Sequence, residues 1–240
     1  MSLGHSPSIV TNGLVLYLDA GNVKSYPGTG TAVTDLVGSG VVGTLTGGPT
    51  YNSVNGGGFV CDGTNDCIAL PAGTMVGTGT SPLTVSLWFK QTKDFTAGQY
   101  IMPIRVQQTS EFFIVFYRAS TTLHAYSVFR GSTQWGTPLT QSDYVNKWLH
   151  FVAVYTGGVK DTAASYVNYC NGAALATGSV SYGAAGGTEY NANQINGDTV
   201  NTGAAGYYPG TMSVVQLYSR ALSAAEVAQN FNALRGRFGI

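Results

Sequence analysis

The segment from Thr84 to Lys90 constrains the fold more than any other, because its side chains alternate between two sets. One set is large and apolar and recurs at every second position: Val85, Leu87 and Phe89. Successive side chains of an extended chain point to opposite faces of a sheet, so this period of two predicts a β-strand. Three later segments have the usual length of strands: Phe112 to Arg118, Leu123 to Phe129 and Trp148 to Tyr155.

Turn-forming residues also indicate β structure. Asn171-Gly172 separates two extended segments, and this dipeptide favours a type I′ hairpin because both central residues need a positive φ. Glycine is abundant, with 33 residues, while charged residues make up only 9% of the chain against a usual share of about 25%. A chain with many turns and little charged helix surface is expected to be all-β.

The remaining stretches are rich in small and polar residues. We expect residues 20–58 to form a long loop with short strands, and residues 178–209 to form a surface excursion. Residues 58–70 indicate a strand, a turn at Asp62-Gly63 and a second strand, and the last strand is expected from Gly210 to Tyr218. No linker or internal repeat divides the chain, which favours a single domain.

One amphipathic helix is predicted near the C-terminus. Ser223 and Glu226 have the spacing of a capping box, in which the two side chains satisfy free amides at the start of a helix. Apolar residues then fall on one face, with Arg235 in the last turn and Gly236 as the expected stop. This stripe, formed by Val227, Phe231 and Leu234, must pack on the β structure to be buried.

Composition excludes two classes of partner. The formal net charge is zero and the basic residues are scattered, so the chain lacks the basic stripe that nucleic acid requires. No run of about 18 apolar residues is present, so we expect no membrane insertion.

Several segments resemble laminin-G-like, concanavalin A-like jelly-roll domains: Gly13 to Asn22, Phe59 to Asp66, Leu83 to Phe89 and Leu217 to Glu226. The stretch from Asn230 to Ile240 is similar to laminin-G-like proteins of tailed-phage particles. The resemblance implies a two-sheet antiparallel jelly-roll sandwich with one short C-terminal helix, formed by residues 9–240 after a tail of residues 1–8. It also implies a virion location, with other virion proteins as partners, and rim loops that bind calcium or sugar.

Cys61 and Cys67 flank the expected turn at Asp62-Gly63, so a hairpin there could place them opposite each other for a disulfide. The favoured interpretation is that all three cysteines, including Cys170, are partly buried free thiols.

A compact group of oxygen-bearing side chains, Asp62, Asn65 and Asp66, offers candidate calcium ligands. The favoured alternative is an Asx-type turn, in which these side chains accept hydrogen bonds from nearby backbone amides.

Catalytic motifs are scarce. Glycoside hydrolases need two carboxyl groups beside the scissile bond, yet the three glutamates, Glu111, Glu189 and Glu226, are isolated in sequence. Carboxylates distant in sequence can still meet in space, so a hydrolase is kept as the least favoured hypothesis. His124 and His150 lie in predicted strands and are expected to be structural.

Exposed aromatic residues are the best candidates for ligand contact. Trp135 ranks first, followed by Tyr190, Tyr207 and Tyr208 near an asparagine-rich stretch. Such residues stack on sugars, but tyrosine and tryptophan are also enriched at protein interfaces, which is the slightly favoured interpretation here. Trp88 and Trp148 are expected in the core.

The sequence therefore predicts a non-enzymatic structural or adhesion protein of a phage virion: a capsid decoration, head fibre or tail fibre component. We expect it to be oligomeric or bound to a lattice, with host-surface polysaccharide as a further contact. The alternative is a calcium-supported carbohydrate-binding module.

Overall fold

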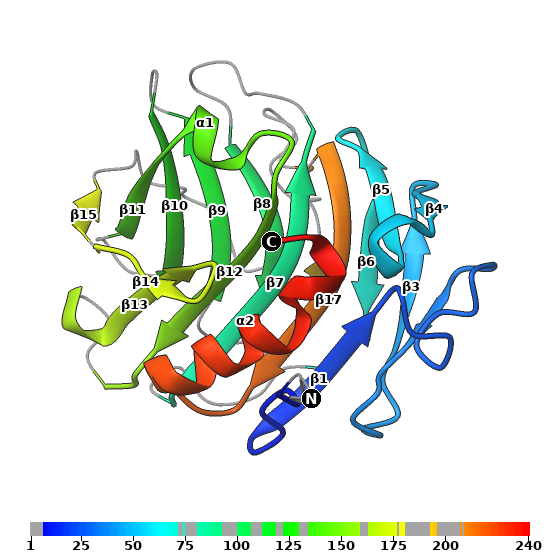
Figure 1. Cartoon of the computed structure of the whole chain (residues 1–240), viewed down its shortest axis with the longest axis horizontal. Coiled ribbons are helices and arrows are strands. Elements are labelled where there is room, and N and C mark those ends of the chain that lie inside the picture. The colour runs from blue at the N-terminus through cyan, green and yellow to red at the C-terminus, as the bar shows by residue number, and fades with distance from the viewer. Residues whose placement is uncertain are drawn as a thin grey trace, which may run out of the picture.

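The computed structural model describes residues 7–71, 74, 81–92, 100–106, 112–118, 122–129, 134–158, 163–176, 178–180, 193–195, 207 and 209–240. Two antiparallel sheets form most of this structure, and one long helix lies across the outside of the first sheet (Figure 1). The predicted all-β sandwich with a C-terminal helix is therefore confirmed.

The first sheet has the order β14-β13-β12-β7-β17-β5-β4, and β1 pairs with β17 beside this path. Its strands are β1 (Leu14–Asp19), β4 (Thr50–Asn52), β5 (Gly58–Asp62), β7 (Leu83–Gln91), β12 (Trp148–Tyr155), β13 (Tyr166–Cys170), β14 (Ala173–Ala174) and β17 (Pro209–Tyr218). The second sheet has the order β15-β11-β10-β9-β8-β16-β6-β3-β2. Its strands are β2 (Ala32–Thr34), β3 (Val42–Thr46), β6 (Cys67–Leu70), β8 (Tyr100–Val106), β9 (Phe112–Arg118), β10 (Thr122–Phe129), β11 (Gln134–Thr140), β15 (Gly178–Val180) and β16 (Asn193–Ile195).

The alternation in β7 places its two sets of side chains on opposite faces of the first sheet. Val85, Leu87 and Phe89 join the main hydrophobic core, which also contains Leu45 and Ile68 of the second sheet. The opposite face is buried as well, because the helix α2 (Ala224–Phe238) covers it. This double coverage explains why a strand with an alternating sequence is buried almost throughout.

Helix α2 begins as predicted, since Ser223 and Glu226 form both hydrogen bonds of the capping box. The expected stop at Gly236 is wrong: the helix continues to Phe238, and Gly239 caps it with a φ of 73°. The last turn is held by tertiary contacts, because the Phe238 ring stacks on Trp88 at a centroid distance of 4.3 Å.

The strands predicted on either side of Asp62-Gly63 are both present, but they do not pair as the hairpin that would place Cys61 and Cys67 opposite each other. β5 pairs with β4 and β17 in the first sheet, whereas β6 pairs with β3 and β16 in the second. The connection therefore crosses between the sheets, so Cys61 and Cys67 are not cross-strand partners. Both side chains are buried and neither forms a disulfide, which agrees with the favoured interpretation.

Two other local predictions have different outcomes. The Asn171-Gly172 hairpin is confirmed, since β13 pairs with β14 and the two residues have φ values of 50° and 80°. Within residues 178–209, where a surface excursion was expected, the described segments β15 and β16 belong to the second sheet, and most of the other residues of this range lie outside the described ones. Three short helical turns complete the described elements: α1 (Gln141–Tyr144), η1 (Val54–Gly56) and η2 (Ala163–Ser165). Among the described helices, none is long and apolar enough to cross a bilayer.

Candidate functional site

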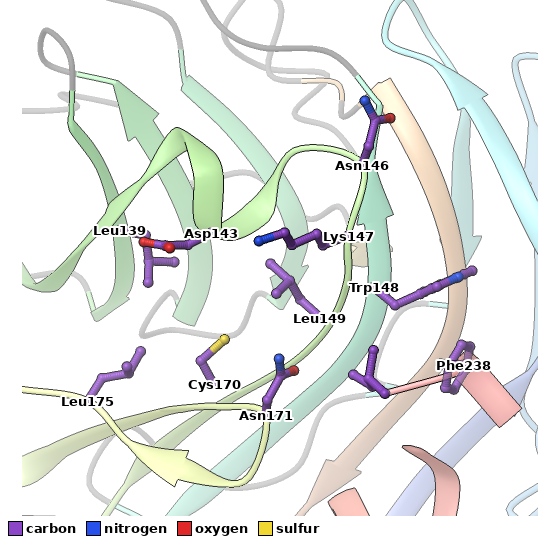
Figure 2. A pocket seen from close by; sticks show the side chains of 11 residues that line it. Leu139, Asp143, Asn146, Lys147, Trp148, Leu149, Cys170, Asn171, Leu175 and Phe238 are labelled. Carbon is purple, nitrogen blue, oxygen red and sulfur yellow. The ribbon is translucent and has the colours of Figure 1, made fainter. Parts of the chain in front are cut away.

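A cavity of about 620 Å³ lies where the chain crosses from the second sheet to the first. Its lining comes from the end of β11, from α1 and the turn after it, from β12 and β13, and from the end of α2 (Figure 2). Four polar side chains border it: Asp143, Asn146, Lys147 and Asn171. The rest of the lining is largely apolar: Leu139, Trp148, Leu149, Cys170, Leu175, Phe238 and Ile240.

The crossover that forms one side of the cavity is fixed by its backbone. Tyr144 of α1 is buried in the main core. Asn146 follows with a φ of 59°, and its N–H donates to the carbonyl oxygen of Gln91 at 2.7 Å. The N–H of Lys147 then donates to the carbonyl oxygen of Tyr144. These contacts reverse the chain sharply, and they leave the side chains of Asp143, Asn146 and Lys147 exposed.

Asn171 forms the facing edge of the cavity and is held by two hydrogen bonds to β12. Its Oδ1 atom accepts from the N–H of His150 at 2.9 Å, and its own N–H donates to the carbonyl oxygen of His150 at 2.8 Å. The hairpin turn therefore continues the sheet, and the asparagine side chain stands at a defined position on the rim.

Two aromatic rings form the wall nearest to α2. The rings of Trp148 and Phe238 lie 4.6 Å apart, and Figure 2 shows them on the opposite side of β12 from Leu149 and Cys170. Trp148 belongs to a hydrophobic cluster, as predicted, but it also borders the cavity.

The charged side chains that border the cavity balance each other, with one carboxylate from Asp143 and one ammonium group from Lys147. Figure 2 shows the amino group of Lys147 extending toward the side on which Asp143 lies. Burial, reinforced by the negative charge of Asp143, raises the pKa of Cys170 to about 11. The thiol is thus neutral near pH 7 and is neither an activated nucleophile nor a good metal ligand.

A serine–histidine contact elsewhere has the spacing of a nucleophile and its base. Ser86 Oγ lies 2.9 Å from His150 Nε2, and the same hydroxyl donates to Gln216 Oε1 at 3.1 Å. All three side chains are fully buried on the face that α2 covers. Burial also lowers the pKa of His150 to about 3, so the imidazole is neutral. A substrate cannot reach this pair, which agrees with the structural role expected for His150.

The proposed calcium ligands do not converge on a common point. Asp66 is buried and accepts a hydrogen bond from the N–H of Asp62 at 2.9 Å, whereas Asp62 and Asn65 are exposed. Asp62 Oδ1 accepts from the N–H of Thr64 at 2.7 Å, as in an Asx turn. Within the described residues, no group of three His, Cys, Asp or Glu side chains could hold a metal ion. This donor set does not fit the six to eight oxygen ligands that Ca²⁺ takes, and calcium stays a prediction from the resemblance.

Only two of the four aromatic residues predicted to contact a ligand lie within the described part of the chain. Trp135 lies in β11, where its backbone pairs with Ser127 and Ser179, and the structure describes only the backbone of this residue. Tyr207 is half-buried just before β17. Tyr190 and Tyr208, like the glutamates Glu111 and Glu189, lie outside the described residues.

Sequence reasoning did not select the polar residues of the cavity. Asp143 and Lys147 are ordinary surface residues in sequence, and Asn171 was recognised only as a turn residue. They form a site because segments far apart in the chain lie close together at one crossover. A local sequence pattern does not predict which distant segments come together.

Comparisons with known proteins place the fold. Residues 62–228 match the family described as the concanavalin A-like lectin/glucanases superfamily. No curated protein sequence matches the chain.

Several solved structures share the fold at low sequence identity. A Trypanosoma rangeli sialidase in complex with sialic acid aligns with a TM-score of 0.62 and 15% identity, over 98% of this chain and 36% of that one. The botulinum neurotoxin type G receptor-binding domain gives 0.61 and 14%, over 92% and 51%. The binding domain of Paraclostridial mosquitocidal protein 1 gives 0.62 and 15%, over 92% and 52%.

The chain thus spans between about a third and a half of these proteins, and at such identities the likeness concerns the fold alone. The family match is different in kind, because it rests on the sequence and covers more than half of the chain. The chain belongs to the concanavalin A-like lectin/glucanases superfamily.

Proposed function

We propose that this chain is a lectin-like domain that binds carbohydrate without hydrolysing it, displayed on the particle of a tailed phage. In that setting it serves as a capsid decoration, head fibre or tail fibre component, and it contacts polysaccharide on the host surface. Other virion proteins are its structural partners.

The observation that carries the non-enzymatic part is the way the carboxylates are used. Asp19 accepts from Arg237, and Asp35 accepts from three backbone amides and from Ser39. Asp66 accepts a hydrogen bond from the N–H of Asp62, and Asp62 accepts one from the N–H of Thr64. Glu226 accepts hydrogen bonds from Ser223 and Arg220. Of the carboxylates that the structure describes, Asp143 alone borders the cavity.

Glycoside hydrolysis by the common mechanisms needs two carboxyl groups on either side of the scissile bond, about 5 to 10 Å apart. One carboxylate accompanied by two carboxamides can bind sugar hydroxyls but cannot supply both an acid and a nucleophile. Binding without hydrolysis is therefore the activity that the described residues support best.

Recognition is also supported by the character of the structural neighbours. Two of them are a receptor-binding domain and a binding domain, and the third is a sialidase in complex with sialic acid. The virion part rests on the likeness of the stretch from Asn230 to Ile240 to phage-particle proteins.

Binding and hydrolysis can be tested on one sample. The purified chain is applied to an array of bacterial and host glycans with and without EDTA, and the bound glycans are then incubated with it and analysed for products. We expect binding that survives EDTA and no cleavage. Binding lost with EDTA would favour the calcium-supported module, and cleavage abolished by Glu111→Gln or Glu189→Gln would establish a hydrolase.

The virion part is tested separately, on phage particles that carry this chain. Mass spectrometry of purified particles is expected to detect it in many copies, and electron cryo-microscopy is expected to locate it on the capsid or tail surface. Particles without the chain, together with a purified chain that binds no virion protein, would overturn the virion proposal and leave carbohydrate binding intact.

A further inference from the structure

We propose that the cavity beside β12 is the carbohydrate site, and that it takes the uncharged end of a saccharide about the size of a disaccharide. This inference rests on the proposed function and adds to it a location and a class of ligand.

The polar rim has the chemistry that neutral hydroxyl groups need. Asp143 accepts hydrogen bonds, Lys147 donates them, and the carboxamides of Asn146 and Asn171 do both. Asn171 Oδ1 already accepts from the N–H of His150, but its Nδ2 group makes no hydrogen bond within the described part of the chain. Vicinal hydroxyls both donate and accept, so a sugar edge matches this mixed set.

The charges favour a neutral ligand over an acidic or basic one. One ammonium group and one carboxylate border the same cavity, so a charged sugar would gain from one and be repelled by the other. An uncharged saccharide avoids this conflict and hydrogen-bonds to both ionised groups. Hydrogen bonds to charged groups are also the stronger ones.

The apolar part of the lining matches the C–H face of a pyranose ring. Leu175 is half-buried and Ile240 is exposed, and both border the cavity together with the edge of Trp148. The volume of about 620 Å³ lies within the range of about 300 to 1,000 Å³ that is usual for small-molecule sites. A cavity of this size holds a short saccharide end rather than a long chain.

The rim is rigid, which reduces the entropic cost of binding. Asn171 is fixed by two hydrogen bonds to His150, and α1 is anchored by Tyr144 in the core. These contacts therefore fix the backbone positions from which the polar side chains extend.

The test uses uncharged and charged saccharides as probes: cellobiose, lactose, maltose and N,N′-diacetylchitobiose, with 3′-sialyllactose as the anionic member. Binding is followed by calorimetry and by tryptophan fluorescence, because Trp148 borders the cavity. The full chain is compared with Lys147→Ala, Asp143→Asn and the charge reversal Lys147→Glu. The control is Lys24→Ala, which removes an exposed lysine that does not line the cavity.

We expect at least one uncharged disaccharide to bind, and each cavity substitution to weaken that binding about tenfold or more, as for the loss of a hydrogen bond to a charged group. Lys24→Ala is expected to leave the dissociation constant unchanged within twofold. Circular dichroism of every variant checks that the fold is retained.

Three results would overturn the inference. If the chain binds glycans on the array but the cavity variants bind as well as the wild type, the site lies elsewhere and the proposed function stands. If 3′-sialyllactose binds best and Lys147→Ala abolishes that binding, the ligand class is wrong. If the wild type binds no saccharide in either assay, this inference and the proposed carbohydrate binding both fail.

Discussion

The last turn of α2 contacts two regions that use polar side chains in opposite ways. Arg237 enters a junction of strands, where Nη1 lies 2.7 and 2.9 Å from the two carboxylate oxygens of Asp19. Its Nη2 group donates to Ser213 Oγ at 2.7 Å, and its Nε group donates to the carbonyl oxygen of Asn55 at 3.0 Å. The next residue, Phe238, borders the cavity, where Asp143, Asn146 and Lys147 are exposed instead.

The junction is where the first sheet changes partners. The first half of β17 pairs with β5 and the second half pairs with β1, on the same edge of the strand. Ser213 lies between the two halves, at a bulge, and Gly21 packs against Gly56 so closely that an added Cβ would lie 1.7 Å from the carbonyl oxygen of Gly56. Arg237 satisfies the groups that this change of partners leaves unpaired. Polar groups at the junction therefore maintain the fold, whereas the side chains of Asn146 and Lys147 at the cavity are exposed to solvent and accessible to a ligand.

The largest loss of stability is expected from the substitution Arg237→Met at the junction. The side chains of Asp19 and Arg237 are only 7% and 19% exposed, so the variant leaves a buried carboxylate without its countercharge. Removing one partner of such a pair costs about 3 to 5 kcal/mol. We expect a loss of this size in the free energy of unfolding, measured by urea denaturation. In a double-mutant cycle with Asp19→Asn, the combined loss should be well below the sum of the single losses. A loss below about 1 kcal/mol in Arg237→Met would show that the junction does not depend on the pair.

A second test concerns His150, which lies under α2 between the two regions. Burial lowers its pKa to about 3 in the folded state, whereas the unfolded chain has a value near 6.5. Below pH 6.5 the unfolded state therefore binds more protons than the folded state. The contribution of His150 to the free energy of unfolding is fully present above that pH and is lost as the pH falls toward 3. The slope approaches about 1.4 kcal/mol per pH unit.

Urea denaturation at pH 7, 6 and 5 measures this slope, and the variant His150→Gln serves as the reference because it cannot titrate there. The wild type is expected to lose stability over this range more steeply than the variant. Equal slopes in the two proteins would mean that folding does not lower the pKa of His150.

An ion pair at the other end of α2 is more accessible to solvent than the pair at the junction, so the two can be compared. Glu226 accepts from Arg220 and from the N–H of Ser223, and these hydrogen bonds lower its pKa to about 2. Both side chains of the pair are more than a quarter exposed, so solvent screens the interaction. We expect Glu226→Ala to lower the free energy of unfolding by only about 1 kcal/mol, mostly through loss of the helix cap. If Glu226→Ala lowered the free energy of unfolding as much as Arg237→Met, the Arg220–Glu226 pair would contribute as much stability as the buried Asp19–Arg237 pair.

These regions also show which features the sequence could predict. The alternation in β7, the Asn171-Gly172 turn and the start of α2 at Ser223 each depend on interactions between residues near in sequence, and all three are confirmed. The end of α2 depends on Arg237 and Phe238 meeting strands about 20 to 220 residues away, so the local stop signal at Gly236 was misleading.

The same limit applies to partner choice and to the cavity. β5 and β6 have the sequence of a hairpin, but β17 offers β5 a free edge in the first sheet while β3 and β16 take β6 in the second. The cavity assembles side chains from both sheets and from α2, and its polar members have no pattern of their own. The fold class followed from local periodicity, whereas the candidate site depended on long-range contacts.

The least destabilising substitution is expected at the rim of the cavity. If the rim of the cavity serves ligands rather than the fold, then Lys147→Ala should change the free energy of unfolding by no more than about 0.5 kcal/mol, as for an ordinary exposed residue. Its ammonium group makes no ion pair or hydrogen bond within the described residues, so nothing buried loses a partner. Urea denaturation measures the free energy of unfolding of Lys147→Ala and of Lys24→Ala, and we expect the two values to agree. A loss above about 1.5 kcal/mol in Lys147→Ala alone would mean that the lysine stabilises the crossover, and the cavity would then resemble the junction rather than differ from it.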